Sequence, residues 1–147
     1  MQRCLVHIQR MCLIWLTRNP KYLAGQELRV IVLMLLKIKT QNDKIYWVRQ
    51  LFLWYENHKE FINQKTINAS TGKYWYTHKL IRRSYFTLKR ALPNMFHFLE
   101  DPKIPSTTNG IEGFFSHLKN HLDIHRGLTE KNRKNFIKWY LYFSNEK

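Results

Sequence analysis

The chain of 147 residues is poor in cysteine, in acidic residues and in long apolar runs. Its two cysteines, Cys4 and Cys12, are too few for a disulfide framework, so we expect a reducing compartment and a cytoplasmic protein. The most apolar run, residues 28–36, is interrupted by Arg29 and closed by Lys37, well short of the roughly 20 residues that span a bilayer. We therefore expect no membrane association. No internal repeat or low-complexity segment is present.

The scarcity of acid leaves a strongly basic chain. It has 10 Asp and Glu against 25 Lys and Arg, a formal charge of +15, which favours a polyanionic partner. A ribosomal-type or membrane-surface protein would share this charge, so its sign alone does not identify the partner. Five Trp, eight Tyr and nine Phe within 44% hydrophobic residues suffice for a core, which excludes a disordered basic tail. The length allows one domain, or a piece of a larger one.

Apolar residues recur at three- and four-residue intervals, which predicts a mainly α fold. A first helix should end near Asn19-Pro20, because the residue before proline avoids the helical region, and a second should span residues 26–39. A polar turn at residues 41–43 offers an N-cap to a third helix, and the polar segment 63–72 is the best internal hinge. The apolar positions expected to face the core are Leu5, Ile8, Cys12 and Trp15 in the first helix and Ile45, Val48, Phe52 and Tyr55 in the third.

A fourth helix, expected over residues 76–92 and ended by Pro93, carries an unusual density of cations. Leu80, Leu88 and Leu92 should point inward. The cations expected to point outward are Lys79, Arg82, Arg83, Lys89 and Arg90. Two interpretations remain open: a solvated face, or a surface that follows a phosphate backbone and releases condensed counterions.

The last part of the chain is expected to be extended over residues 98–108, which include two prolines, and then helical. In the first of its helices we expect Asn109 to be the N-cap and the apolar residues Ile111, Phe114, Phe115, Leu118 and Leu122 to be buried. Thr129 can cap the final helix, which Phe136, Ile137, Tyr140 and Leu141 should anchor to the core. If the chain is a piece of a larger domain, the missing part would leave apolar faces uncovered, and the aromatic residues then expected to be exposed are Phe114, Phe115, Trp139, Tyr140 and Phe143.

Glu112 and Lys119 are the most informative pair in this region. At about 100° per residue, seven positions return Lys119 to nearly the azimuth of Glu112, about 10 Å along the axis. An acid able to bind a metal and a cation able to bind phosphate would then share one face. Asn109 followed by Glu112 three residues later is also an ordinary capping box, so spacing alone leaves a purely structural Glu112 open.

Histidines and tryptophans add weaker signals. His117, His121 and His125 recur every four residues along one flank, and we interpret them as facing DNA or solvent rather than a metal. Trp54 and Trp75 are candidates for stacking on an unpaired base, although a core position is the more probable one for each.

The string T-T-N-G-I-E-G-F-F-S-H-L-K, followed by H-R-G-L and R-x-x-F-I-x-W-Y-L, resembles the carboxy-terminal catalytic block of bacterial insertion-sequence transposases of the acidic-triad (DDE) class, Mutator-like superfamily. Q-R-C-L-V-H resembles the C-x2-H element that follows their second catalytic aspartate, which places Cys4 and His7. As a bare pattern Cys4 and His7 are a packed pair, so we assign no zinc. The resemblance implies that Glu112 is the third catalytic acid and a metal ligand, and that Lys119 contacts DNA. On the basis of charge, we expect Arg126 and the cations of the fourth helix to contact the DNA backbone as well.

The same resemblance implies the carboxy-terminal portion of a ribonuclease-H-like catalytic domain, with most β-strands missing. Residues 1–19 would hold the helix after the absent second aspartate, residues 20–105 an all-helical insertion, and residues 106–147 the catalytic block. Two Mg²⁺ or Mn²⁺ ions would serve DNA cleavage and strand transfer in the complete enzyme.

One carboxylate cannot position two ions, so we expect a truncated or split transposase fragment that is inactive alone. Its partners would be transposon-end and target DNA, and the missing amino-terminal part or a full-length transposase. The alternative is a non-catalytic basic helical nucleic-acid-binding protein.

Overall fold

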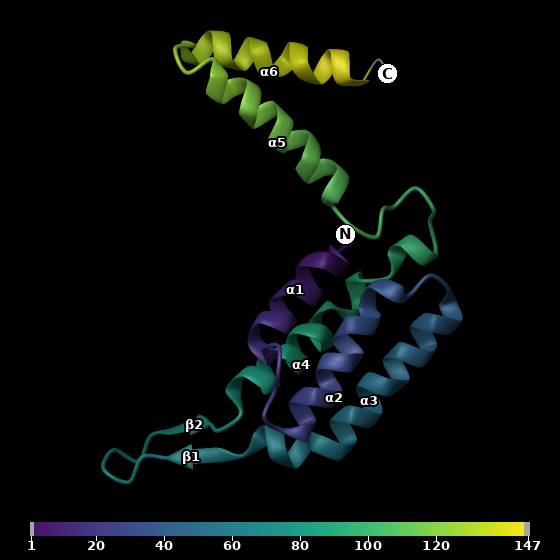
Figure 1. Ribbon diagram of the computed structural model, residues 1–147, viewed down its shortest axis with the longest axis vertical. Coiled ribbons are helices and arrows are strands. Elements are labelled where there is room, and N and C mark those ends of the chain that lie inside the picture. Colours follow the sequence, from purple (N-terminus) through teal and green to yellow (C-terminus); the bar gives the residue numbers. More distant parts are fainter. Residues whose placement is uncertain (1, 146–147) are drawn as a thin grey trace. The chain divides into compact units, whose positions relative to one another are not determined.

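The computed structural model of the chain describes residues 2–145, and within them it is mainly helical, as the apolar spacing predicts. Six α-helices and one two-stranded antiparallel hairpin occupy these residues (Figure 1). The helices are α1 (Leu5–Leu16), α2 (Leu23–Met34), α3 (Gln41–Asn63), α4 (Lys79–Ala91), α5 (Asn109–Ile124) and α6 (Glu130–Asn145). The strands are β1 (Lys65–Ile67) and β2 (Tyr74–Tyr76), and single 3₁₀ turns cover Leu35–Lys37, Leu92–Asn94 and His97–Leu99.

The chain divides into two compact units. The first extends to Thr107 and holds α1 to α4 with the hairpin; the second begins at Thr108 and holds α5 and α6. The expected boundary between residues 105 and 106 lies two residues from this division. The expected segments 1–19 and 20–105 both lie in the first unit, where α1 packs against α2 and α4, and the Leu5 N–H donates to the carbonyl of Ser106 at 3.3 Å.

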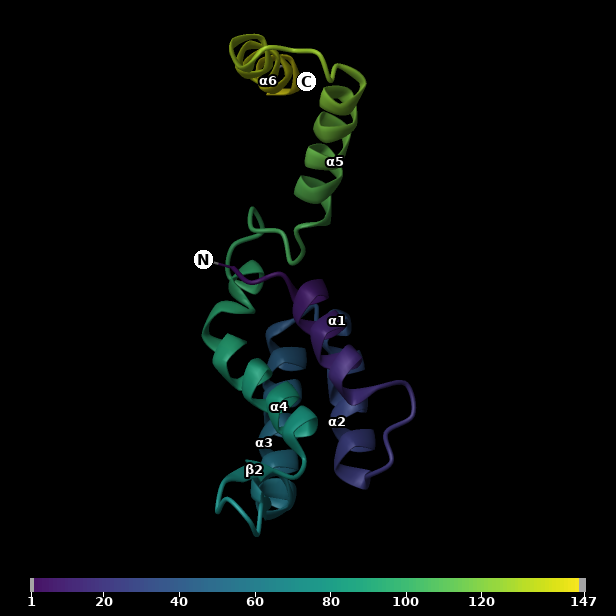
Figure 2. The ribbon, with the colours of Figure 1, turned by 90° about the vertical axis from the view of Figure 1, so that its left-hand side faces the viewer.

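The first unit is a four-helix arrangement in which α4 lies against α1, and α2 lies between α1 and α3 (Figures 1 and 2). One apolar core joins all four helices. From α1 it takes Leu5, Ile8, Cys12 and Leu16, at the three- and four-residue spacing that the sequence shows. Leu16 is buried and Trp15 only half-buried, so the fourth core position of α1 is one residue later than predicted.

Two tryptophans attach α3 to α2. Trp47 and Trp54 are 1% and 3% exposed, and their indole N–H groups donate to the carbonyls of Ile31 at 2.7 Å and Ala24 at 2.9 Å. A buried Trp needs such a partner for its single donor. The core position expected for Trp54 is therefore confirmed.

The predicted apolar stripe of α3 was half correct. Val48 and Tyr55 are partly buried against the core, but Ile45 and Phe52 are exposed. The fully buried face consists of Trp47, Leu51, Trp54 and Ile62. Both sets have helical spacing, and they differ by about one residue of rotation. The indole hydrogen bonds of Trp47 and Trp54 favour the observed face. The spacing of apolar residues along the sequence does not reveal these hydrogen bonds.

The beginning of α3 has a complete capping box. Thr40 is the N-cap, its hydroxyl accepts from the Asp43 N–H at 3.1 Å, and the Asp43 carboxylate accepts from the Thr40 N–H at 2.9 Å. The polar segment 63–72, expected to be a hinge, instead holds the end of α3, strand β1 and the turn of the β1–β2 hairpin, in which the Gly72 N–H donates to the Asn68 carbonyl at 2.9 Å and Gly72 has a φ of 66°. The hairpin contradicts the expectation that residues 20–105 are all-helical. Three paired residues on each strand are too few to give a clear alternating pattern in the sequence.

The second unit pairs α5 with α6 through aromatic rings. Phe114 lies 5.4 Å from Tyr140, and His125 lies 5.7 Å from Phe136, measured between ring centroids. Thr129 caps α6 as predicted, accepting from the Asn132 N–H at 3.3 Å. Among the described residues of this unit only Leu118 is buried.

The expected burial in this unit was therefore only partly correct. Ile111 and Phe115 of α5 are each 54% exposed, and Leu141 of α6 is 38% exposed, contrary to the prediction. Two helices alone cannot cover both of their apolar faces. Of the aromatic set expected to be exposed, Phe115, Trp139 and Phe143 are exposed, while Phe114 and Tyr140 are half-buried between α5 and α6.

Over residues 2–145 no helix combines the length and the apolar character needed to cross a bilayer.

Candidate nucleic-acid interface

Helix α4 has two chemically different faces. Tyr85, Leu88 and Ala91 are buried in the core, whereas Lys79, Arg83, Lys89 and Arg90 are exposed and Arg82 is half-buried. The outward direction predicted for these cations is confirmed for the four exposed ones, whereas Arg82 has a buried Nη1. Leu80 departs from its predicted inward position and is 41% exposed.

Aromatic rings hold the guanidinium groups of α4 in place. The Arg82 guanidinium carbon lies 4.0 Å from the centroid of Tyr76 and 4.3 Å from that of Phe86, and the Arg83 carbon lies 4.4 Å from the centroid of Trp15. A cation over an aromatic face is attracted to the ring quadrupole. These rings hold the positive charges in place before binding. Each side chain therefore loses less conformational entropy when it binds a phosphate.

The two cations at the end of α4 are placed in the same way. The Lys89 ammonium lies 5.6 Å from the centroid of Tyr55 and 6.0 Å from that of Phe86, and Arg90 Nε donates to the Phe86 carbonyl at 3.1 Å. Beneath them Tyr55 stacks on Tyr85 at 4.6 Å, and burial raises the pKa of Tyr85 to about 12. Tyr85 therefore carries no charge at physiological pH.

Across the described residues, no cation of α4 forms an ion pair with a carboxylate. Two acids of this unit are paired with other residues: Glu27 with His58 at 2.7 Å and Glu56 with Lys59 at 2.8 Å. The first unit contains eighteen Lys and Arg and six Asp and Glu, a formal charge of +12. The positive field over α4 is consequently not neutralised by its own chain.

A shallow hollow of about 400 Å³ runs along this surface. It is lined by Tyr76, Lys79, Arg82, Arg83, Phe86 and Arg90, which we call the α4 strip. The hairpin continues the pattern, because the Lys65 ammonium lies 4.2 Å from the centroid of Tyr74. Trp75 on β2 is 48% exposed, so the core position favoured for it was wrong, and its ring is accessible for stacking.

Sequence reasoning missed the rings of the strip. Phe86 stands four residues from both Arg82 and Arg90, and this spacing could have identified its part in ordering them. Tyr76 comes from β2 and Trp15 from α1, so their part in the strip depends on tertiary packing and has no local signal.

Glu112 and Lys119 both lie within the continuous helix α5 and both are exposed, which is the arrangement that their seven-residue spacing predicts. Asn109 is the first residue of α5, and Thr108 is at the N-cap position, so the prediction that Asn109 is the cap was wrong. The Thr108 hydroxyl donates to Glu112 Oε1. Glu112 therefore has a local structural contact at the start of the helix.

The other predicted residues of the catalytic block have varied surroundings. Arg126 follows α5 and its Nε donates to the Asp123 carbonyl at 3.2 Å, which partly satisfies the helix end. His121 and His125 are exposed, yet their rings also face α6, His121 at 5.8 Å from Tyr140 between centroids. His117 is exposed on the same helix.

Cys4 and His7 lie in the first unit. Cys4 is half-buried at the N-cap position of α1, and His7 is in the first turn, three residues later. The other cysteine, Cys12, is fully buried, and its burial raises the pKa of the thiol to about 12.

The described acids of the second unit do not by themselves form a site for two divalent ions. Glu112 is at the start of α5 and Asp123 is near its end, eleven residues or about 16 Å along the axis. Two carboxylates at that separation cannot bind the same ion, because Mg²⁺ is held at about 2.1 Å from each oxygen.

Comparison with protein families, with curated proteins and with solved structures found no match to this chain.

Proposed function

We propose that this chain binds DNA through the α4 strip and its flanking Lys89, as part of a transposase of the acidic-triad class. The observation that carries the DNA-binding proposal is the row of α4 cations, ordered on aromatic rings and lacking carboxylate partners within residues 2–145. A solvated helix face needs neither property. A surface that contacts phosphates benefits from both.

The charge of the strip accounts for affinity without sequence preference. Each Lys or Arg that neutralises a phosphate releases condensed counterions, and this contributes about −0.9 to the slope of log K against log salt for duplex DNA. The exposed ring of Trp75 adds a stacking surface for an unpaired base.

The transposase part of the proposal rests on the resemblance around Glu112 and on the shared helix of Glu112 and Lys119. In the complete enzyme, upstream aspartates would join Glu112 in binding Mg²⁺ or Mn²⁺ on a ribonuclease-H-like fold, with residues 20–105 as a helical insertion. Lys119 and Arg126 would contact DNA near that centre. With one catalytic acid, the chain by itself should neither cleave nor join DNA.

Fluorescence anisotropy with a labelled duplex at several salt concentrations tests the binding proposal. The double variant Lys89→Gln/Arg90→Gln removes two exposed charges from α4. We expect the slope of log K against log salt to become less negative by about 1.8, corresponding to two lost phosphate contacts. The affinity should fall by a similar factor for any duplex sequence.

Lys37→Gln/Lys39→Gln is the matched control, since both lysines are exposed and follow α2 in the same unit. This control lowers the net charge by the same amount as Lys89→Gln/Arg90→Gln. It should leave most of the slope of log K against log salt unchanged. If both double variants lose the same affinity and slope, DNA is attracted by net charge alone and the α4 strip is not the interface. Specific nicking of transposon-end DNA by the chain with Mg²⁺ or Mn²⁺ would refute its predicted inactivity.

The competing function is a stand-alone basic helical nucleic-acid-binding protein in which Glu112 serves only the start of α5. Glu112→Gln in a reconstituted complete enzyme separates the two roles of Glu112. Lost activity with intact folding supports a metal-ligand role, whereas lost stability with retained activity supports a capping role, which the Thr108–Glu112 contact favours.

A further inference from the structure

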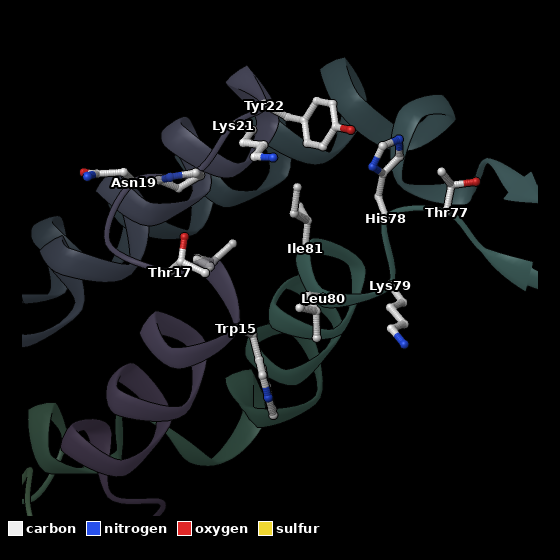
Figure 3. Close-up of a pocket in the computed structure, with 12 residues that line it drawn as sticks. Trp15, Thr17, Asn19, Lys21, Tyr22, Thr77, His78, Lys79, Leu80 and Ile81 are labelled. Atoms are coloured by element: carbon white, nitrogen blue, oxygen red, sulfur yellow. The ribbon is translucent and has the colours of Figure 1, made fainter.

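A second hollow, of about 390 Å³, lies between the end of α1, the loop that leads to α2 and the first turn of α4 (Figure 3). All of its lining residues belong to the first unit. Its size is at the lower end of the roughly 300–1,000 Å³ typical of small-molecule sites. It therefore suits a small ligand, and it shares only Lys79 with the α4 strip.

The loop that forms one wall of this hollow is held by side chains of α2. Arg29 Nε donates to the Thr17 carbonyl at 3.1 Å, and Gln26 Nε2 donates to the Pro20 carbonyl at 3.0 Å. Thr17 has a φ of 63° and a ψ of 176°, a conformation that a β-branched residue avoids. The hydrogen bond from Arg29 keeps Thr17 there, so this wall is shaped before any ligand arrives.

The opposite wall is equally fixed. His78 is 9% exposed, stacks on Phe61 with 3.7 Å between centroids, and its Nε2 lies 3.1 Å from Gln64 Oε1. Burial lowers the pKa of His78, so the imidazole is neutral at physiological pH and contributes no charge to the wall. Tyr22 contacts the same imidazole edge-on at 4.8 Å.

The lining combines apolar surface with positive charge. Leu80, Ile81 and Trp15 give apolar walls, and Lys21 and Lys79 are the charged residues. In Figure 3 the Lys21 side chain is directed toward Ile81, whereas Lys79 is directed away from it, so Lys21 is the cation nearer the hollow. The lining residues include no carboxylate, which disfavours a cationic ligand.

We propose that this hollow binds a nucleoside monophosphate unit, with its base against the apolar walls and its phosphate at Lys21. A planar base needs apolar faces on which to lie, and a phosphate needs a nearby cation. Thr17 and Thr77 hydroxyls in the lining offer hydrogen bonds to the sugar or to a base edge. The unit is either a free nucleotide or a residue of a single strand. This site is additional to the phosphate surface of α4.

Isothermal titration of the whole chain with adenosine monophosphate, adenosine and inorganic phosphate at constant ionic strength tests the proposal. The monophosphate should bind about tenfold more tightly than either part, because only the monophosphate engages the walls and Lys21 together. Lys21→Gln should weaken it about tenfold. Leu80→Trp should abolish binding by filling the hollow without altering the melting temperature, since Leu80 is 41% exposed.

Lys37→Gln is the control, because it removes an equal charge from an exposed position outside the lining. Any one of three results would overturn the proposal. Phosphate could bind as tightly as the monophosphate, or Lys21→Gln and Lys37→Gln could lose the same affinity for the monophosphate. The third is binding that does not saturate at millimolar nucleotide. A short oligodeoxyadenylate identifies the source: Lys21-dependent binding of the oligomer indicates a strand residue, and binding of the monophosphate alone indicates a free nucleotide. Lys89→Gln/Arg90→Gln should leave nucleotide binding unchanged, so failure here is distinguishable from failure of the DNA-binding proposal.

Discussion

Replacing Gly25 by alanine should destabilise the first unit, although the same change stabilises most helices. Gly25 is buried in α2, and a Cβ at this position would lie 2.9 Å from Pro20 Cβ and 3.3 Å from Ile81 Cδ1. Real Cβ atoms essentially never approach another carbon to 2.9 Å, so one partner must move. Pro20 has little room to do so, because its ring is rigid and Gln26 holds its carbonyl.

Two opposing terms decide the sign. Alanine is favoured over glycine in a helix interior by about 1 kcal/mol. Overpacking a well-filled site costs about 1–3 kcal/mol. The contact with Pro20 is severe and that with Ile81 moderate, so we take about 2 kcal/mol for the clash within that range. The net expectation is a loss of about 1 kcal/mol in the free energy of unfolding.

Urea denaturation followed by far-ultraviolet circular dichroism measures this loss as a lower midpoint with an unchanged slope. Gly113→Ala is the matched substitution, because Gly113 is also within a helix and its added Cβ would have no neighbour within 4 Å. It should stabilise α5 by up to about 1 kcal/mol. A Gly25→Ala chain as stable as the wild type, or more stable, would show that the α1–α2 loop is not closely packed on α2 and would refute the reasoning.

Three further outcomes follow from buried and capping groups. In a Cys4→Ser background, Cys12 should react with a thiol reagent at pH 8 at least about tenfold more slowly than in the unfolded chain, because burial raises its pKa to about 12; equal rates would contradict its burial. Trp54→Phe should lower the free energy of unfolding by about 1–2 kcal/mol, through the lost hydrogen bond to Ala24 and the lost ring contacts, whereas Trp75→Phe should leave it unchanged; comparison of the two urea midpoints tests this. Hydrogen bonds from the Lys39 N–H and from Thr40 hold the pKa of Asp43 below its usual 3.8, so the stability that Asp43 contributes is complete above that pH and is lost as the pH falls through the lowered pKa. Wild type and Asp43→Asn should therefore differ in thermal midpoint at pH 6 and converge toward pH 2, and a constant difference would argue against this cap.

The sequence by itself determined the secondary structure of most of this chain. Apolar periodicity placed α1, α4, α5 and α6 close to their observed positions, since an amphipathic helix repeats its buried residues every three or four positions. It also determined that Glu112 and Lys119 share one helical face and that the cations of α4 point away from the core. These are local properties, fixed by residues within two turns of one another.

Tertiary structure decided the features that depend on distant residues. The buried face of α3 was selected by hydrogen bonds from Trp47 and Trp54 to α2, and apolar spacing alone favoured a neighbouring face. Likewise, Arg83 stands over Trp15 because α4 lies against α1, and Thr17 is strained because Arg29 reaches its carbonyl from α2. Such contacts join positions more than ten residues apart, and no periodicity along the chain encodes them. The sequence thus determined where the charges of α4 lie, and packing of α1, α2 and the hairpin against α4 decided that rings order them and that a hollow forms beside them.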